Sequence, residues 1–201
     1  MKSILFICVL MLSFKVSSQN NGTFIDKRDG QSYNWVKIGS QIWMAENLKF
    51  KIKGSSYYDL YQYGRLYTYE TAIKICPSGW HLPSDNEWKI LESILGMNEE
   101  NLNSNNRNRY VGNEGKILKS KIGWRYNGNG IDKYGFKALP GGFYQRYSKK
   151  FLHYGSFAYF WTSTSYDEEN AIYRTLGSEW QSIDKGDIYK VHGLSCRCLK
   201  D

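Results

Sequence analysis

The chain has 201 residues, enough for one globular domain with a short extension. Lys and Arg outnumber Asp and Glu by 27 to 19, but the basic residues are scattered among acidic ones, which argues against nucleic-acid binding. Aromatic residues make up 16% of the sequence, which is typical of a strand-rich core with polar-edged aromatics or, less commonly, of a carbohydrate-stacking surface.

Residues 1–18 have the features of a secretory signal in the expected order. A basic residue precedes an apolar run, and small residues end at Ser18. The run is too short for a transmembrane segment, which needs about 20 apolar residues. A lipid anchor would need a cysteine directly after the small residues, whereas Cys8 lies inside the apolar run. We expect cleavage near Ser18 and a mature domain, residues 19–201, that is secreted or lies in the periplasm or cell envelope.

The pattern along the chain predicts an α+β domain with antiparallel strands at both ends and two to three short helices between them. Ser84 and Glu87 form a capping box that opens a helix, with Trp88 and Leu91 on one face and an end at Gly96. Alternating aromatic runs separated by turn residues predict the strands. The expected strands are 24–26, 33–38, 42–46, 136–139, 157–164, 171–176 and 188–199, the expected helices are 71–76, 84–96 and 115–121, the expected turns include 128–130, 141–142 and 185–187, and 97–111 is expected to be an exposed connection.

Three cysteines, Cys76, Cys196 and Cys198, remain after loss of the leader. One bridge and one free thiol is the simplest arrangement in an oxidising compartment. Cys196 and Cys198 would face the same side of a strand, so either could bond Cys76, whereas their own extended separation of roughly 7 Å disfavours a mutual bond. A bridge from Cys76 to Cys198 would stabilise the fold by about 4 kcal/mol. Three buried thiols are the alternative.

No motif indicates a metal, cofactor or nucleophile. His81, His153 and His192 do not form short-spaced pairs, and His81 is expected to be structural. Residues 127–132 resemble a calcium loop only faintly, because the terminal glutamate is missing, so a glycine-rich turn is favoured. No Gly-x-Ser-x-Gly nucleophile elbow is present.

Several blocks occur in an order that is typical of one family. They include Val36-Lys37-Ile38-Gly39, Trp43-Met44-Ala45-Glu46-Asn47-Leu48, Cys76-Pro77-x-Gly79-Trp80-His81-Leu82-Pro83, Tyr134-Gly135-Phe136-x-Ala138-Leu139-Pro140-Gly141-Gly142 and Arg197-Cys198-x-Lys200-Asp201. Together the blocks resemble the Fibrobacter succinogenes major paralogous domain over residues 24–201.

The resemblance implies an exported protein with a C-type-lectin-like single domain, related in architecture to formylglycine-generating enzymes. It also implies that Cys76 pairs with Cys198, while Cys196 stands where the family usually has an aliphatic residue. Calcium-dependent lectins of this fold use Glu-Pro-Asn or Gln-Pro-Asp with Trp-Asn-Asp. None of these tripeptides occurs in the sequence, so calcium-dependent sugar binding is not expected.

Function is expected to reside in the loops, since a fold alone does not specify a ligand. We expect a non-catalytic binding module for a glycan or a cell-surface protein, using loops 97–111, 126–134 and 144–156. Tyrosine supplies contact area at low conformational-entropy cost. A structural envelope component is one alternative, and an enzyme related to the formylglycine-generating group, with Cys196 or Cys198 as a reactive thiol, is another. The candidate binding residues are Tyr126, Tyr144, Tyr147 and Tyr154.

Overall fold

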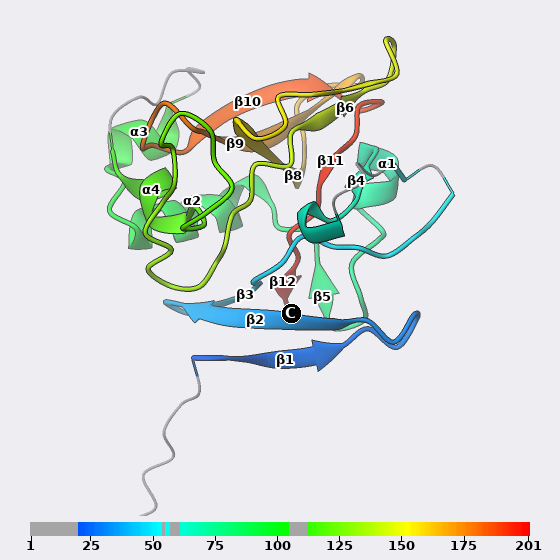
Figure 1. The fold of residues 1–201 in the computed structure, drawn as a ribbon, viewed down its shortest axis with the longest axis horizontal. Helices are drawn as coiled ribbons and strands as arrows, with labels where there is room; N and C mark the ends of the chain where they lie inside the picture. The colour runs from blue at the N-terminus through cyan, green and yellow to red at the C-terminus, as the bar shows by residue number, and fades with distance from the viewer. Residues whose placement is uncertain (1–19, 54, 57–60, 105–111) are drawn as a thin grey trace, which may run out of the picture.

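The computed structural model describes residues 20–53, 55–56, 61–104 and 112–201, and strands dominate both ends of this part of the chain (Figure 1). The domain is therefore α+β, as predicted. In chain order the elements are β1 (Asn21–Ile25), β2 (Ser32–Ile38), β3 (Gln41–Met44), the 3-10 helix η1 (Tyr61–Tyr63), β4 (Leu66–Tyr67), α1 (Tyr69–Ala72), β5 (Trp80–His81), α2 (Asp85–Ile94), α3 (Glu99–Asn103), α4 (Glu114–Leu118), β6 (Phe143–Gln145), β7 (Lys150–Leu152), β8 (Phe157–Ser165), β9 (Asn170–Gly177), β10 (Asp184–Tyr189), β11 (Leu194–Ser195) and β12 (Leu199–Lys200).

Two five-stranded sheets organise the domain, one in the lower and one in the upper part of Figure 1. The lower sheet has the order β1-β2-β3-β12-β5, and the upper sheet has the order β10-β9-β8-β11-β4. The pairs in both sheets are antiparallel except β11 with β8, which is parallel. The last two strands of the chain are thus inserted between earlier strands, one in each sheet, and tie the two sheets together.

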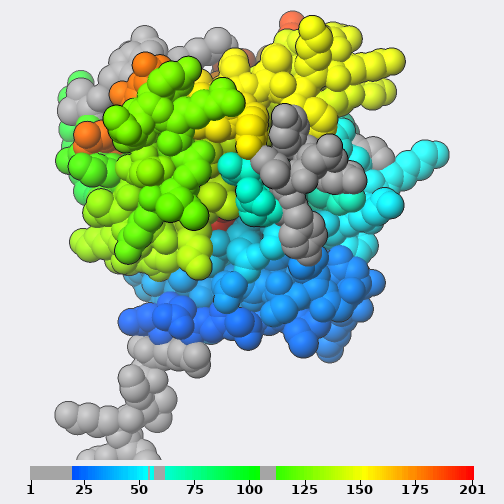
Figure 2. Space-filling view, viewed as in Figure 1, coloured from blue at the N-terminus to red at the C-terminus, as the bar shows by residue number. Residues whose placement is uncertain are grey.

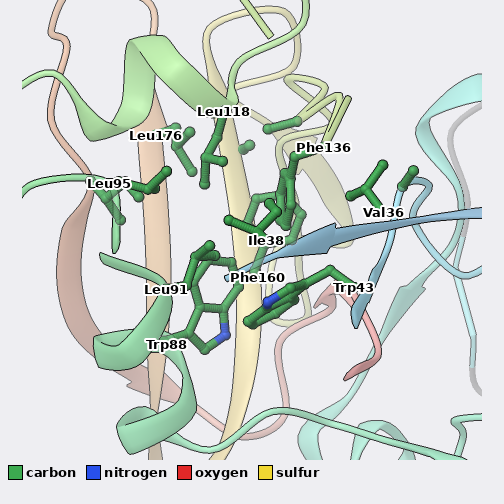
Figure 3. Close-up of a cluster of buried hydrophobic side chains, with 14 of the residues drawn as sticks. Val36, Ile38, Trp43, Trp88, Leu91, Leu95, Leu118, Phe136, Phe160 and Leu176 are labelled. Atoms are coloured by element: carbon green, nitrogen blue, oxygen red, sulfur yellow. The ribbon is translucent and has the colours of Figure 1, made fainter. Parts of the chain in front are cut away.

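A large part of the core is aromatic (Figure 3). Trp43 from β3, Trp88 from α2 and Phe160 from β8 are all fully buried. The ring centroid of Trp88 lies 4.9 Å from that of Trp43 and 5.7 Å from that of Phe160. Such aromatic pairs each contribute about 0.5–1.5 kcal/mol beyond their buried area. Much of the high aromatic content therefore stabilises the fold.

Helix α2 confirms the predicted capping box. The hydroxyl of Ser84 accepts from the backbone N–H of Glu87, and the backbone N–H of Ser84 donates to Oε2 of Glu87 at 2.7 Å. Trp88 and Leu91 are buried on the inner face, as the helical spacing predicted. The helix ends before Gly96, which has a φ of 105° that favours glycine.

The end of the chain is held by a disulfide between Cys76 and Cys198, whose Cα atoms are 5.9 Å apart. This pairing confirms what the family resemblance implied and resolves the choice that spacing alone left open. Cys196 is a free, fully buried thiol. Burial raises the pKa of this thiol, so it stays protonated.

Arg197, between the two cysteines, is fully buried and anchors the tail to the lower sheet. Its guanidinium donates to Oδ1 of Asn47 at 3.1 and 2.6 Å and to the carbonyl of Met44 at 3.2 Å. Its Cζ also lies 4.5 Å from the ring centroid of Phe136. Burial lowers the pKa of Arg197 to about 9, because the negative charges of Glu46 and Asp132 offset only part of the desolvation.

Three predicted elements were wrong. Residues 188–199 do not form one strand, because β10 ends at Tyr189 and the short strands β11 and β12 that follow lie in two different sheets. Residues 136–139 form no strand, because only an isolated bridge joins Ala138 to Lys119. Residues 185–187 form no turn but lie within β10, where Gly186 pairs with Tyr173. A Cβ on Gly186 would lie 2.7 Å from the hydroxyl of Tyr173, so the glycine marks a close approach inside a strand.

The helices also differ from the prediction, since the described residues contain four α-helices instead of two to three. The additional helix, α3, lies in the expected connection 97–111 and is capped by Asn98, whose side chain accepts from the N–H of Asn101 at 2.8 Å. The expected helix 71–76 is displaced toward the N-terminus as α1, Tyr69–Ala72. Residues 105–111 of the expected connection lie outside the described residues. Over the described residues, no helix is long and apolar enough to cross a membrane.

Candidate ligand-binding site

The four candidate tyrosines lie in two surface regions. Tyr126 and Tyr154 line one hollow, and Tyr144 packs behind it with its ring centroid 5.1 Å from that of Phe151. Tyr147 lies at the tip of the β6–β7 hairpin instead, against Tyr189 and His192. Tyr126 and Tyr147 are 70% and 71% exposed, whereas Tyr144 and Tyr154 are partly buried. The structure thus brings two of the four predicted residues together.

The hollow has a volume of about 480 Å³ and is formed by three segments that are distant in sequence. A turn at 125–128, the loop after β7 and the residues after β9 each contribute a wall. The green-to-yellow part of the chain, which supplies the first two walls, covers much of the upper face in Figure 2. The residues that line the hollow are Arg125, Tyr126, Phe151, His153, Tyr154, Ser156, Phe157 and Glu179.

The turn that carries Tyr126 has an unusual backbone. The N–H of Gly128 donates to the carbonyl of Arg125 at 2.9 Å, and the two central residues, Tyr126 and Asn127, have φ values of 54° and 56°. Two positive φ values are typical of a type I′ turn, in which Gly, Asn and Asp are the favoured residues. A bulky tyrosine in this conformation costs of order 1 kcal/mol or more, and such strain is concentrated at functional sites.

Backbone hydrogen bonds hold the three segments in place. The N–H of Arg125 donates to the carbonyl of Gly155 at 2.8 Å, and the N–H of Ser178 donates to the carbonyl of Ser156 at 2.8 Å. Gly155 has a φ of 81°, and a Cβ there would lie 2.8 Å from Nε of Arg125. The hollow is therefore formed by chain segments that are already joined, which lowers the entropy lost on ligand binding.

A second residue in the hollow, His153, also has a left-handed backbone, with a φ of 60°. Its Nδ1 lies 2.7 Å from the hydroxyl of the buried Tyr159. Burial lowers the pKa of His153, so the imidazole is neutral at pH 7. A neutral imidazole can donate from one nitrogen and accept at the other, and Nε2 has no partner among the described residues.

The aromatic and charged groups of the hollow are arranged side by side. The ring of Tyr154 packs edge to face on Tyr63, with centroids 5.3 Å apart, while Cζ of Arg125 lies 5.7 Å from the Tyr154 centroid. Arg125 and Glu179 are both exposed, and neither forms an ion pair within the described part of the chain. The hollow therefore offers aromatic rings next to groups that can both donate and accept hydrogen bonds.

The loop at 127–132 uses its polar side chains to build the turn beside the hollow. Oδ1 of Asn129 accepts from the backbone N–H of Trp124 at 3.1 Å, and Oδ1 of Asp132 accepts from the N–H of Lys137 at 2.8 Å. These oxygens thus satisfy backbone donors, in agreement with the predicted glycine-rich turn. Over the described ranges, no cluster of three or more His, Cys, Asp or Glu residues could hold a metal ion.

Comparison with known proteins gives one decisive match. The family model of the Fibrobacter succinogenes major domain matches residues 36–200, most of the chain. The chain belongs to this family. No curated protein and no solved structure matches the chain.

The family match includes both the hollow and the closing tail, so both belong to the Fibrobacter succinogenes major domain itself. His81 of β5, which contacts the tail, has partners on both ring nitrogens, as expected of a structural histidine. Its Nε2 lies 2.8 Å from Oε1 of Glu87 and its Nδ1 lies 2.6 Å from Oδ1 of Asp201. This cluster holds the last residue of the chain to α2.

The sequence did not identify several residues that line the hollow, chiefly Phe151, His153 and Phe157. A signal for Phe151 was available, because alternating apolar residues flank a turn-like segment at 146–149 and predict the β6–β7 hairpin. No comparable signal exists for His153. Its position depends on a left-handed backbone, which sequence patterns predict poorly for residues other than glycine.

Proposed function

We propose that this member of the family is a secreted or envelope-associated, non-catalytic binding module, and that the hollow around Tyr126 and Tyr154 binds a glycan. The observation that carries the proposal is the strained, highly exposed Tyr126, presented beside Tyr154 on a preassembled set of loops. Nothing in the packing of the core requires a tyrosine at this position. A ligand that contacts the ring gives a reason for the strain.

The chemistry of the walls suits a saccharide. The apolar C–H face of a sugar ring packs on an aromatic ring, and its hydroxyl groups need both donors and acceptors nearby. Arg125 supplies donors, Glu179 supplies acceptors, and the neutral His153 can supply either. An open hollow of this volume suits one or two sugar rings of a longer chain, with the remainder in solvent.

The export of the protein rests on two observations of different kinds. Residues 1–18 have the composition of a secretory signal. The disulfide between Cys76 and Cys198 is typical of an oxidising compartment outside the cytoplasm. Both support a mature domain, residues 19–201, that is released into the medium, the periplasm or the cell envelope.

We also propose that the fold is C-type-lectin-like. Two features support this assignment. Strands from both ends of the domain lie in one sheet, in which β12 pairs with β3, and a disulfide closes the end of the chain. The fold by itself specifies no ligand. The glycan proposal therefore rests on the hollow and not on the fold assignment.

A glycan array probed with the mature protein tests the proposal. We expect binding that survives chelation of divalent cations, because no calcium is needed for stacking and hydrogen bonding. The Y126N variant keeps a residue that tolerates positive φ but removes the ring, so it should lose binding. Y147N, which removes an equally exposed tyrosine from the hairpin tip, is the matched control. Equal binding by the native protein and Y126N would refute the site.

A surface protein is the second candidate ligand, favoured by a different observation. Tyr147, Tyr189 and His192 form an aromatic cluster at the hairpin tip, and Val191 beside it is 44% exposed. Exposed apolar groups of this kind suit a protein interface. Loss of ligand binding in Y147N with full binding in Y126N would favour this reading.

A further inference from the structure

The strand β1 forms one edge of the lower sheet, and hydrogen bonds identify which of its residues face outward. The N–H of Lys37 donates to the carbonyl of Asn20 at 2.8 Å, so Asn20 and Lys37 are a hydrogen-bonded pair of the antiparallel ladder. In such a ladder the residues alternate between the two sides of the strand. The even-numbered residues of β1 therefore face β2, and the odd-numbered residues turn their backbone groups away from it.

The outward residues are Asn21, Thr23 and Ile25. All three are exposed, and their backbone groups have no hydrogen-bond partner within the described part of the chain. In Figure 1 no described element lies beyond β1 on that side. The edge thus offers three backbone N–H and C=O sets to another strand.

The other edges of the two sheets are protected, whereas β1 is not. The edge strand β10 of the upper sheet carries Asp184, Lys185 and Asp187, and the remaining edges, β5 and β4, are only two residues long. Charged residues and short length are the usual protection against edge-to-edge pairing. The sequence of β1, Asn-Gly-Thr-Phe-Ile, contains no charged residue and no proline.

A hydrophobic side chain and a hollow lie at opposite ends of this edge. Ile25, at the end of β1, is 66% exposed. A second hollow, of about 310 Å³, includes Asn21 and Thr23 in its wall together with Tyr134. Asn21, Thr23 and Ile25 share one face of the strand because side chains alternate.

We propose that β1 pairs antiparallel with β1 of a second copy of this chain, on a two-fold axis at Thr23. Each outward N–H then meets an outward C=O, with Thr23 opposite its counterpart and Ile25 of one copy opposite Asn21 of the other. Ile25 of each copy is placed at the rim of the other copy's hollow. The two lower sheets become one continuous sheet.

Self-pairing fits the edge because the strand is its own complement in this register. The basic residues that follow β1, Lys27 and Arg28, lie at opposite ends of the antiparallel pair and do not face each other. One strand pair buries less surface than the roughly 1,200 Å² of a stable interface, so the dimer is reversible and depends on concentration.

Sedimentation of the mature chain from about 10 µM to about 1 mM tests the proposal. The native protein should shift from monomer to dimer within this range. T23P removes an outward N–H while leaving the pairing with β2 intact, so it should remain monomeric at every concentration with an almost unchanged melting temperature. T23V, which keeps the N–H and the strand propensity, is the control and should dimerise as the native chain does.

I25K provides a second variant that does not alter the backbone. It introduces a charge at an exposed edge position and should weaken the dimer by about tenfold or more. A native chain that stays monomeric at about 1 mM would overturn the proposal. Unchanged dimerisation in both T23P and I25K would overturn it as well, because the interface would then lie elsewhere.

Discussion

His81 and Asp201 are joined by a short contact between Nδ1 and Oδ1, 2.6 Å long, although 120 residues separate them. Glu87 contacts the other nitrogen of the same ring at 2.8 Å. Burial by itself would lower the pKa of His81, but the hydrogen bonds to Asp201 and Glu87 outweigh it, and the net pKa is raised. The imidazolium is therefore the form that stabilises the end of the chain.

This raised pKa predicts a pH-dependent stability. A group whose pKa is higher in the folded protein stabilises fully below its unfolded value and loses that contribution as the pH rises through the folded value. Urea unfolding of the native protein and H81Q should therefore differ by up to about 1 kcal/mol near pH 6 and by less at pH 9, since the contacts are partly exposed. A difference that does not change with pH would contradict the role of His81.

Removal of the disulfide should destabilise the fold strongly. The bridge joins residues 122 apart in sequence. In the chain-entropy model, closing a loop of this length stabilises the folded state by about 4–5 kcal/mol. C76S and C198S should each unfold at a much lower urea concentration than the native protein. A bridge that formed with Cys196 instead would leave C198S as stable as the native chain.

The free thiol of Cys196 should be inert in the folded protein. It is fully buried, and burial raises its pKa, so neither access nor thiolate is available. Alkylation at pH 8 followed by mass spectrometry should modify none of the native protein and all of the urea-unfolded protein at this residue. Rapid modification in the folded state would instead favour the enzyme alternative, which needs a reactive thiol in the tail.

Arg197 should be essential for stability despite having no carboxylate among its hydrogen-bond acceptors. R197M would leave Asn47 and several buried backbone carbonyls without their donor, at a cost of about 3–5 kcal/mol. The exposed neighbour Lys200 is the control, because K200M should change the free energy of unfolding by less than about 0.5 kcal/mol. Urea titration of both variants decides the matter, and equal midpoints would contradict this account.

The predictions from sequence were correct where the signal was local. The capping box at Ser84 and the alternation near Trp35 and Val36 depend on neighbours within a few residues, and both elements formed as predicted. Gly186 was predicted to lie in a turn, but it lies in β10. The ring of Tyr173 on the adjacent strand leaves no room for a Cβ there, which is why the position is a glycine. A contact of that kind is invisible in one sequence.

The candidate site was predicted only in part for a similar reason. Tyr126 and Tyr154 were selected individually, as aromatics in polar loops. Their meeting depends on the hydrogen bond between Arg125 and Gly155 and on the left-handed backbones that orient the rings. Sequence spacing carries no information about that juxtaposition.

Titration calorimetry with an oligosaccharide selected on the array is the most direct test of the central claim, which is that Tyr126 contacts the ligand through its ring. Y126F keeps the ring and should bind nearly as tightly as the native protein. Y126N should bind at least about tenfold more weakly, a loss of about 1.4 kcal/mol, with a melting temperature no lower than that of the native protein, because Asn relieves the backbone strain at this position. Equal affinity for the native protein, Y126F and Y126N would contradict the claim.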